Sequence, residues 1–130
     1  MTDQTTARFP GRAPIDAYGR GGFRFAEMSH KGSILCLPSA MTAWPEADAL
    51  ADAAALSPEH FAAVMAERDR IGFLLLGTGR RQVFPSKALR QAFRDAGIGL
   101  DAMDTGAAAR TYNVLLAEGR PLAAALLAVD

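Results

Sequence analysis

The stretch Ile71-Gly72-Phe73-Leu74-Leu75-Leu76 decides the fold, because it is an apolar run with almost no polar interruption. Such a run is typical of a strand that is buried on both faces, as in a sheet with helices on each side. Directly after it comes Gly77-Thr78-Gly79-Arg80-Arg81, which is rich in turn-forming and basic residues. We therefore expect a central strand at 71–76 and a loop that leaves it at the carboxyl edge of the sheet.

The next segment predicts a helix from about Ser86 to Ala96, because its apolar residues recur at helical spacing. Gly97 is expected to end this helix as the C′ residue. A short strand is predicted over 99–103. The apolar face of the helix consists of Leu89, Ala92, Phe93 and Ala96.

A third helix is predicted after Asp104 and Thr105, both of which can cap its free N–H groups, with Thr105 as the cap residue. Gly119 and Pro121 are expected to end it. Residues 122–129 then predict a last buried strand, with an Ala-rich helix as the alternative. The apolar stripe of the third helix consists of Ala108, Tyr112, Leu115 and Leu116, with the Tyr112 hydroxyl at the core edge.

The sequence before the central run predicts a β-meander over 15–37, because short alternating segments are separated by glycine-rich turns. Ser57 and Pro58 predict the start of a helix that contains Phe61, Val64, Met65 and Arg68. Residues 46–56 are compatible with a weak helix or an ordered loop. The fold expected is an α/β layered single domain over 15–130, with an N-terminal β-meander followed by β-α-β-α-β, a mixed central sheet flanked by helices, and a flexible arm at 1–14.

Composition argues against a duplex nucleic-acid partner, because 14 basic and 14 acidic residues give a net charge of zero. Aromatic residues alternate with Arg20 and Arg24, as in some RNA-binding sheets, but aromatic residues in strands more often belong to the core. The one cysteine, Cys36, lies in an apolar run, and we expect it to be buried and unreactive. The aromatic residues concerned are Tyr18, Phe23 and Phe25.

No secretory signal is recognised at 1–14, which contains no apolar h-region. The longest strongly apolar stretch, Leu122 to Val129, is far shorter than the roughly 20 residues of a membrane span. The sequence therefore predicts a cytoplasmic protein that does not insert into a membrane.

No complete catalytic constellation is present, so we do not expect an enzyme. His30 and His60 are the only histidines, and neither has the neighbours needed for a Ser-His-Asp or Cys-His set. No pair of histidines or cysteines has a metal-ligand spacing. We therefore predict no cofactor and no metal.

The loop at 77–81 is the most site-like feature. Its glycines would let backbone N–H groups approach an anion, and its arginines add positive charge. The competing interpretation, which we favour, is a turn that needs glycine geometry and carries solvated arginines.

The segment from Asp104 to Asn113 has a polar helix face. This face could hold a ligand, or it could form hydrogen bonds with a neighbouring loop, and we favour the hydrogen bonds. Parallel strands at 71–76 and 99–103 would bring both segments to one edge of the sheet. The ligand-binding candidates are Gly77, Thr78, Gly79, Arg80, Arg81, Asp104, Thr105, Arg110 and Asn113.

An ordered set of motifs over about residues 15–127 resembles a small domain family of unknown function. That family includes archaeal and bacterial structural-genomics proteins and a mitochondrial assembly factor for respiratory complex I (NADH:ubiquinone oxidoreductase). This sequence departs from the family pattern at two places. The meander turn has Ala26-Glu27 where Asn-Gly-like residues are common, and the stretch at 46–56 is longer than usual. The motifs are Ile15–Gly19 with Gly22–Phe25, Gly32–Pro38, Leu75–Gly79, Met103–Thr105 with Ala108 and Arg110–Leu115, and Glu118–Arg120 with Ala123–Leu126.

The resemblance implies an α/β layered domain with a mixed central sheet and no established enzymatic activity. Bacterial members tend to be encoded near membrane-protein export genes, which suggests the building of membrane complexes. We therefore expect a non-enzymatic protein-interaction or assembly-factor domain, with membrane-complex subunits or assembly factors as partners. The alternative is a domain that binds an anion or small ligand through the Gly77–Arg81 loop and the Asp104–Asn113 segment. A weaker third class is an enzyme that uses Asp104, Arg110 and Asn113.

Overall fold

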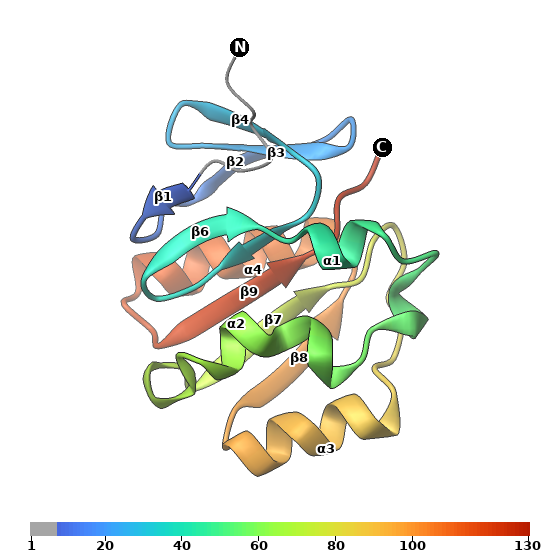
Figure 1. The fold of residues 1–130 in the computed structure, drawn as a ribbon. Coiled ribbons are helices and arrows are strands. Elements are labelled where there is room, and N and C mark those ends of the chain that lie inside the picture. Colours follow the sequence, from blue (N-terminus) through green and yellow to red (C-terminus); the bar gives the residue numbers. More distant parts are fainter. Residues whose placement is uncertain (1–7) are drawn as a thin grey trace.

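In the computed structural model, which describes residues 8–130, the apolar run becomes β7 (Phe73–Gly77), an interior strand next to one edge of the main sheet. Strand β7 pairs in parallel with β8 (Gly99–Met103) on one side and β9 (Leu122–Leu126) on the other. The side chains of Leu74, Leu75 and Leu76 are almost fully buried, as expected for a strand that is covered on both faces. Figure 1 shows this sheet running through the molecule.

The main sheet has six strands and mixed direction, which confirms the predicted fold class. Its three remaining strands pair antiparallel and extend the sheet beyond β9. The strand order is β1-β6-β5-β9-β7-β8, where β1 is Arg8–Pro10, β5 is Ile34–Cys36 and β6 is Ala40–Ala43.

Helices cover both faces of the main sheet (Figure 1). On one face, α2 (Ala62–Met65) and α3 (Lys87–Ala96) enclose a core in which Phe61 lies between Trp44 and Phe93, with both pairs of ring centroids 5.2 Å apart. On the other face, α4 (Thr105–Ala117) closes a second core that contains Tyr112. Two layers of apolar packing therefore hold the sheet in place.

The N-terminal meander forms a separate three-stranded antiparallel sheet, whereas the sequence pattern suggested one continuous meander over 15–37. It packs on the α4 side, because Phe23 and Phe25 are buried in the same core as Tyr112. The next strand, β5, leaves it and joins the main sheet. The strands of the small sheet are β2 (Ile15–Gly19), β3 (Gly22–Phe25) and β4 (Met28–Lys31).

The region between β6 and β7 contains only short helices, so the continuous helix predicted after Ser57 is wrong. It breaks into η3 (Pro58–Phe61), α2 and η4 (Arg68–Arg70). The His60 ring accepts the backbone N–H of Ser57 at 3.0 Å and so closes the first turn. The uncertain stretch at 46–56 lies in α1 (Pro45–Asp48), η2 (Ala53–Ala55) and the loops around them.

Three boundaries also differ from expectation. Within the arm expected to be flexible, Arg8–Pro10 forms β1, and residues 1–7 lie outside the described part of the chain. The cap of α4 is Asp104, whose Oδ1 accepts the N–H of Ala107, and Thr105 is the first helical residue. The last strand ends at Leu126 rather than at 129.

Candidate functional site

The loop after β7 and the start of α4 lie side by side at the carboxyl edge of the sheet. The backbone N–H of Thr78 donates to the Met103 carbonyl at 2.9 Å, and the N–H of Thr105 donates to the Gly79 carbonyl at 2.8 Å. The Thr105 hydroxyl oxygen accepts the N–H of Gly79 at 3.0 Å and donates to the Leu127 carbonyl at 2.7 Å. Thr105 therefore joins the loop, the helix and the end of β9 through its single hydroxyl.

The two glycines of the loop serve different purposes. Gly79 has φ of +100°, which confirms that one of them adopts the left-handed region. Gly77 is needed for close packing, because a Cβ there would lie 3.0 Å from the Leu126 side chain and from Thr105. Both glycines are thus explained by the geometry of the turn.

The donors that an anion cradle would use are partly occupied by the chain itself. The backbone N–H groups of Thr78 and Gly79 bond Met103 and Thr105 respectively. The buried Thr78 hydroxyl donates to the Arg81 carbonyl at 2.5 Å and accepts the N–H of Val83 at 3.0 Å, which closes the turn internally. The first half of the loop is therefore a structural joint: its polar groups bond one another and the start of α4 instead of forming an open phosphate cradle.

The two arginines face a hollow of about 350 Å³ between their loop and the segment around α1 and η2. Arg80 and Arg81 are both exposed, and in residues 8–130 neither forms an ion pair with Asp104 or another carboxylate. Two carboxylates also line this hollow: Asp48 accepts the N–H of Ser33, and Asp52 accepts the N–H of Ala54. This hollow, rather than the glycine turn, is where an added anion would meet the arginines.

The remaining candidates lie apart from this hollow. Asn113 pairs its side-chain amide with the backbone of Ile15, accepting its N–H and donating to its carbonyl, both at 2.8 Å. Asn113 thereby attaches β2 to α4. Arg110 is exposed and lines a different shallow hollow beside Asp16 and Tyr18. The structure thus brings Gly77–Arg81 together with Thr105 and Asp104 but not with Arg110 or Asn113.

The two core side chains with reactive groups, Cys36 and Tyr112, are buried. Cys36 is fully buried, and burial raises the pKa of its thiol to about 12. Burial also raises the pKa of the Tyr112 hydroxyl, which donates to the Ala13 carbonyl at 3.1 Å. No group of metal-ligating side chains occurs in residues 8–130, and no helix in that range is long and apolar enough to cross a membrane.

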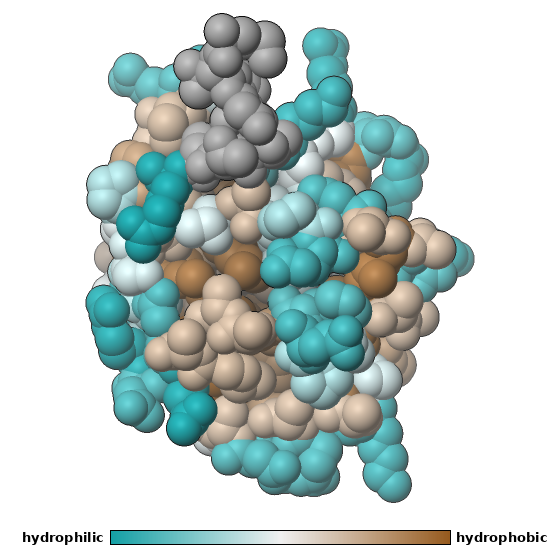
Figure 2. All heavy atoms as spheres, viewed as in Figure 1, coloured by the Kyte–Doolittle hydropathy of each residue, from teal (hydrophilic) through white to brown (hydrophobic). Residues whose placement is uncertain are grey.

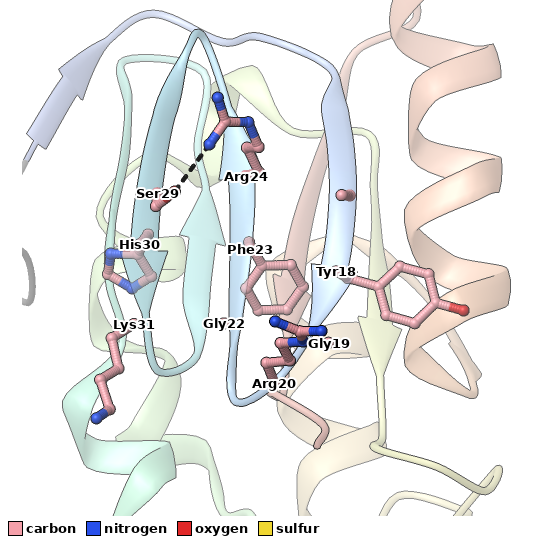
Figure 3. Close-up of a pocket in the computed structure, with 10 residues that line it drawn as sticks. Tyr18, Gly19, Arg20, Gly22, Phe23, Arg24, Ser29, His30 and Lys31 are labelled. Atoms are coloured by element: carbon pink, nitrogen blue, oxygen red, sulfur yellow. Dashed lines mark hydrogen bonds between the residues drawn. The ribbon is translucent and has the colours of Figure 1, made fainter.

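A second hollow, of about 470 Å³, lies on the outer face of the small sheet (Figure 3). The sequence analysis noted Arg20 and Arg24 there only as part of an aromatic and basic pattern, and did not predict a hollow. Its cationic side chains are Arg20, Arg24 and Lys31. The signal was present in the alternation of Phe23-Arg24-Phe25, which places Arg24 opposite the buried rings. Only the pairing of β3 with β4 adds Lys31, and sequence spacing does not reveal that pairing.

Comparison with known proteins relates residues 15–127 to the family described as protein of unknown function (DUF498/DUF598). An uncharacterised protein of Rhodobacter capsulatus is 38% identical over 119 residues, which cover 92% of this chain and 87% of that protein. The mouse protein named NADH dehydrogenase (ubiquinone) 1 alpha subcomplex assembly factor 3 is 29% identical over 93% of this chain. The matched part spans 63% of that mouse protein, so the mammalian relative is considerably longer.

The fold is also found in solved structures. A crystal structure of a Bartonella henselae protein, described as an outer membrane protein, superposes with a TM-score of 0.87 at 48% sequence identity. The match covers 94% of this chain and 99% of the other.

Proposed function

This chain belongs to the DUF498/DUF598 family, and on that premise we propose that it is a non-enzymatic assembly-factor domain that binds proteins while a respiratory membrane complex is built. The observation that carries the proposal is the alignment of 93% of this chain with the mouse complex I assembly factor. The site chemistry is compatible with it, because the polar groups of the Gly77 turn mostly bond one another rather than facing a reaction centre.

Protein binding through a single large apolar patch is not favoured by the surface. The large apolar side chains most exposed in residues 8–130 are Phe84, Val114 and Tyr18, and they belong to a loop, a helix and a strand respectively. Figure 2 shows hydrophobic residues gathered over α2, where alanines are exposed. Scattered apolar side chains favour a small and reversible interface over a large permanent one.

The test is deletion of the gene in its native host. We expect the level of assembled NADH:ubiquinone oxidoreductase, measured on native gels, to fall, and the level of succinate dehydrogenase to stay unchanged as a control. A plasmid copy of the gene should restore the complex. Unchanged levels of NADH:ubiquinone oxidoreductase in the deletion strain would refute the proposal.

The second candidate function is binding of a small anion by Arg80 and Arg81. It is favoured by one observation, namely that both side chains are exposed beside a hollow and form no ion pair within residues 8–130. Titration with inorganic phosphate should shift the amide NMR signals of the loop in the wild type but not in an Arg80→Gln, Arg81→Gln variant. No shift at millimolar phosphate would leave only the protein-binding proposal.

A further inference from the structure

Strand pairing brings Arg24 and Lys31 to the outer face of the small sheet, and Arg20 lies in the turn between β2 and β3. Arg24 of β3 stands between Ala17 of β2 and Ser29 of β4, and Lys31 lies opposite Gly22. Phe23 and Phe25 point inward to the core, so the side chain between them points outward. Figure 3 shows Arg20, Arg24 and Lys31 arranged around the same face.

No carboxylate neutralises these cations in residues 8–130. All three are exposed and line the hollow, and no aspartate or glutamate is among the lining residues. The ion pairs found in that range involve Arg70 and Arg120, which lie elsewhere. The small sheet carries one carboxylate in a strand, Asp16 of β2, and one in a turn, Glu27 between β3 and β4, and neither lines the hollow. Asp48, outside the sheet, accepts the N–H of Ser33.

The hollow is also shaped to admit a side chain. The residues paired with Arg24 on either side, Ala17 and Ser29, are small and exposed, which leaves space above the sheet. The Nη1 of Arg24 donates to the Ser29 hydroxyl at 3.1 Å, which holds the guanidinium across the sheet before any partner arrives. An arginine fixed in this way loses less freedom when it binds a carboxylate.

We propose that this hollow is a docking site for an acidic segment of a partner protein, whose carboxylates contact Arg24 and Lys31. Charge complementarity argues for that occupant. A bilayer surface fits less well, because the face is hollowed and Tyr18, the large exposed apolar side chain in its lining, turns its ring toward Gly106 of α4. The inference rests on the proposed protein-binding function and names the chemistry of one partner surface.

The probe is a synthetic peptide of alternating glutamate and glycine, titrated into the full chain and followed by amide NMR shifts. We expect shifts confined to 19–24 and 29–31, and none with the matching glutamine peptide. An Arg24→Glu, Lys31→Glu variant should bind at least about tenfold more weakly. The matched control is Lys87→Glu, Arg90→Glu on the exposed side of α3, which reverses two charges as well and should bind like the wild type.

Several results would overturn the inference. One is an equal loss of affinity in the α3 control, because binding would then follow net charge alone. Another is sedimentation of the wild type, but not of Arg24→Glu, Lys31→Glu, with phosphatidylglycerol vesicles, which would assign the face to a membrane. If the charge-reversed variant does not fold, the neutral Arg24→Gln, Lys31→Gln variant replaces it and should bind about threefold more weakly or worse.

The same variants separate this inference from the function it rests on. In the native host, Arg24→Glu, Lys31→Glu should fail to restore complex levels in the deletion strain, while the α3 control restores them. Full restoration by Arg24→Glu, Lys31→Glu would overturn the docking site and leave the assembly function intact. An unaffected deletion strain would instead refute the assembly function, whatever the peptide titration shows.

Discussion

Replacing Thr105 with valine tests whether the loop after β7 is a structural joint. The substitution keeps the shape of a fully buried side chain but removes the hydroxyl that bonds both Gly79 and Leu127. One N–H and one carbonyl then lose their partner. Each such loss costs about 1–3 kcal/mol, and because both backbone groups are only half-buried, we expect about 2–4 kcal/mol in total.

Urea unfolding followed by circular dichroism measures this cost. With a slope of about 2 kcal/mol per molar urea, the midpoint should fall by about 1–2 M. The matched control is Thr111→Val on the same helix, where the hydroxyl only reaches the sulfur of Met103 at 3.7 Å and little stability should be lost. A Thr105→Val midpoint equal to that of Thr111→Val would refute the assignment of the loop as a joint.

Three further outcomes are expected. Gly77→Ala should destabilise by about 1–3 kcal/mol in thermal unfolding, because its Cβ would crowd Thr105 at 3.0 Å; an unchanged melting temperature would contradict this contact. Asn113→Ala should speed hydrogen exchange at the Ile15 amide, which loses its acceptor, while exchange in β7 stays slow. Because burial raises the pKa of Cys36 from 9.0 to about 12, the unfolded chain loses the thiol proton first. Stability should therefore fall above pH 9 by up to about 1.4 kcal/mol per pH unit, and Cys36→Ala should reduce that slope in urea unfolding at alkaline pH.

The parts of the fold that local signals specify were predicted well. The apolar run at 71–76 identified an interior strand of the main sheet, observed as Phe73–Gly77. Ser86 begins α3 as its N-cap, and Gly97 ends it with φ of +75°. Parallel pairing of β7 with β8 followed from the helix between them. Each of these depends on residues that are close together in sequence.

The parts that depend on distant partners were not predicted. β1 exists because Phe9 pairs with Met41 of β6, and nothing in its own three residues identifies a strand. The helix expected after Ser57 is interrupted, and its Phe61 packs between Trp44 and Phe93, which are distant in sequence and which the local pattern does not reveal.

In the candidate site, too, a contact that follows from strand order was predictable, whereas a contact between distant segments was not. The contact between Gly79 and Thr105 was predictable from strand order, because both follow parallel neighbours. The pairing of Asn113 with Ile15 spans 98 positions and joins a helix to a strand of another sheet. The polar face of Asn113 was expected to bond a neighbouring segment, and it does, but no periodicity identifies Ile15 as the partner.

The attachment of the N-terminal layer to the C-terminal elements also has a consequence for the order of folding. Ile15 bonds Asn113, the Arg12 guanidinium donates to the Leu122 carbonyl, and the Ser33 hydroxyl accepts the N–H of Ala128. During synthesis the first strands therefore leave the ribosome long before the residues that anchor them exist. Because contacts this distant in sequence form slowly, the inner face of the meander stays uncovered until β9 has emerged, and folding of this domain is completed only after Ala128 has been made.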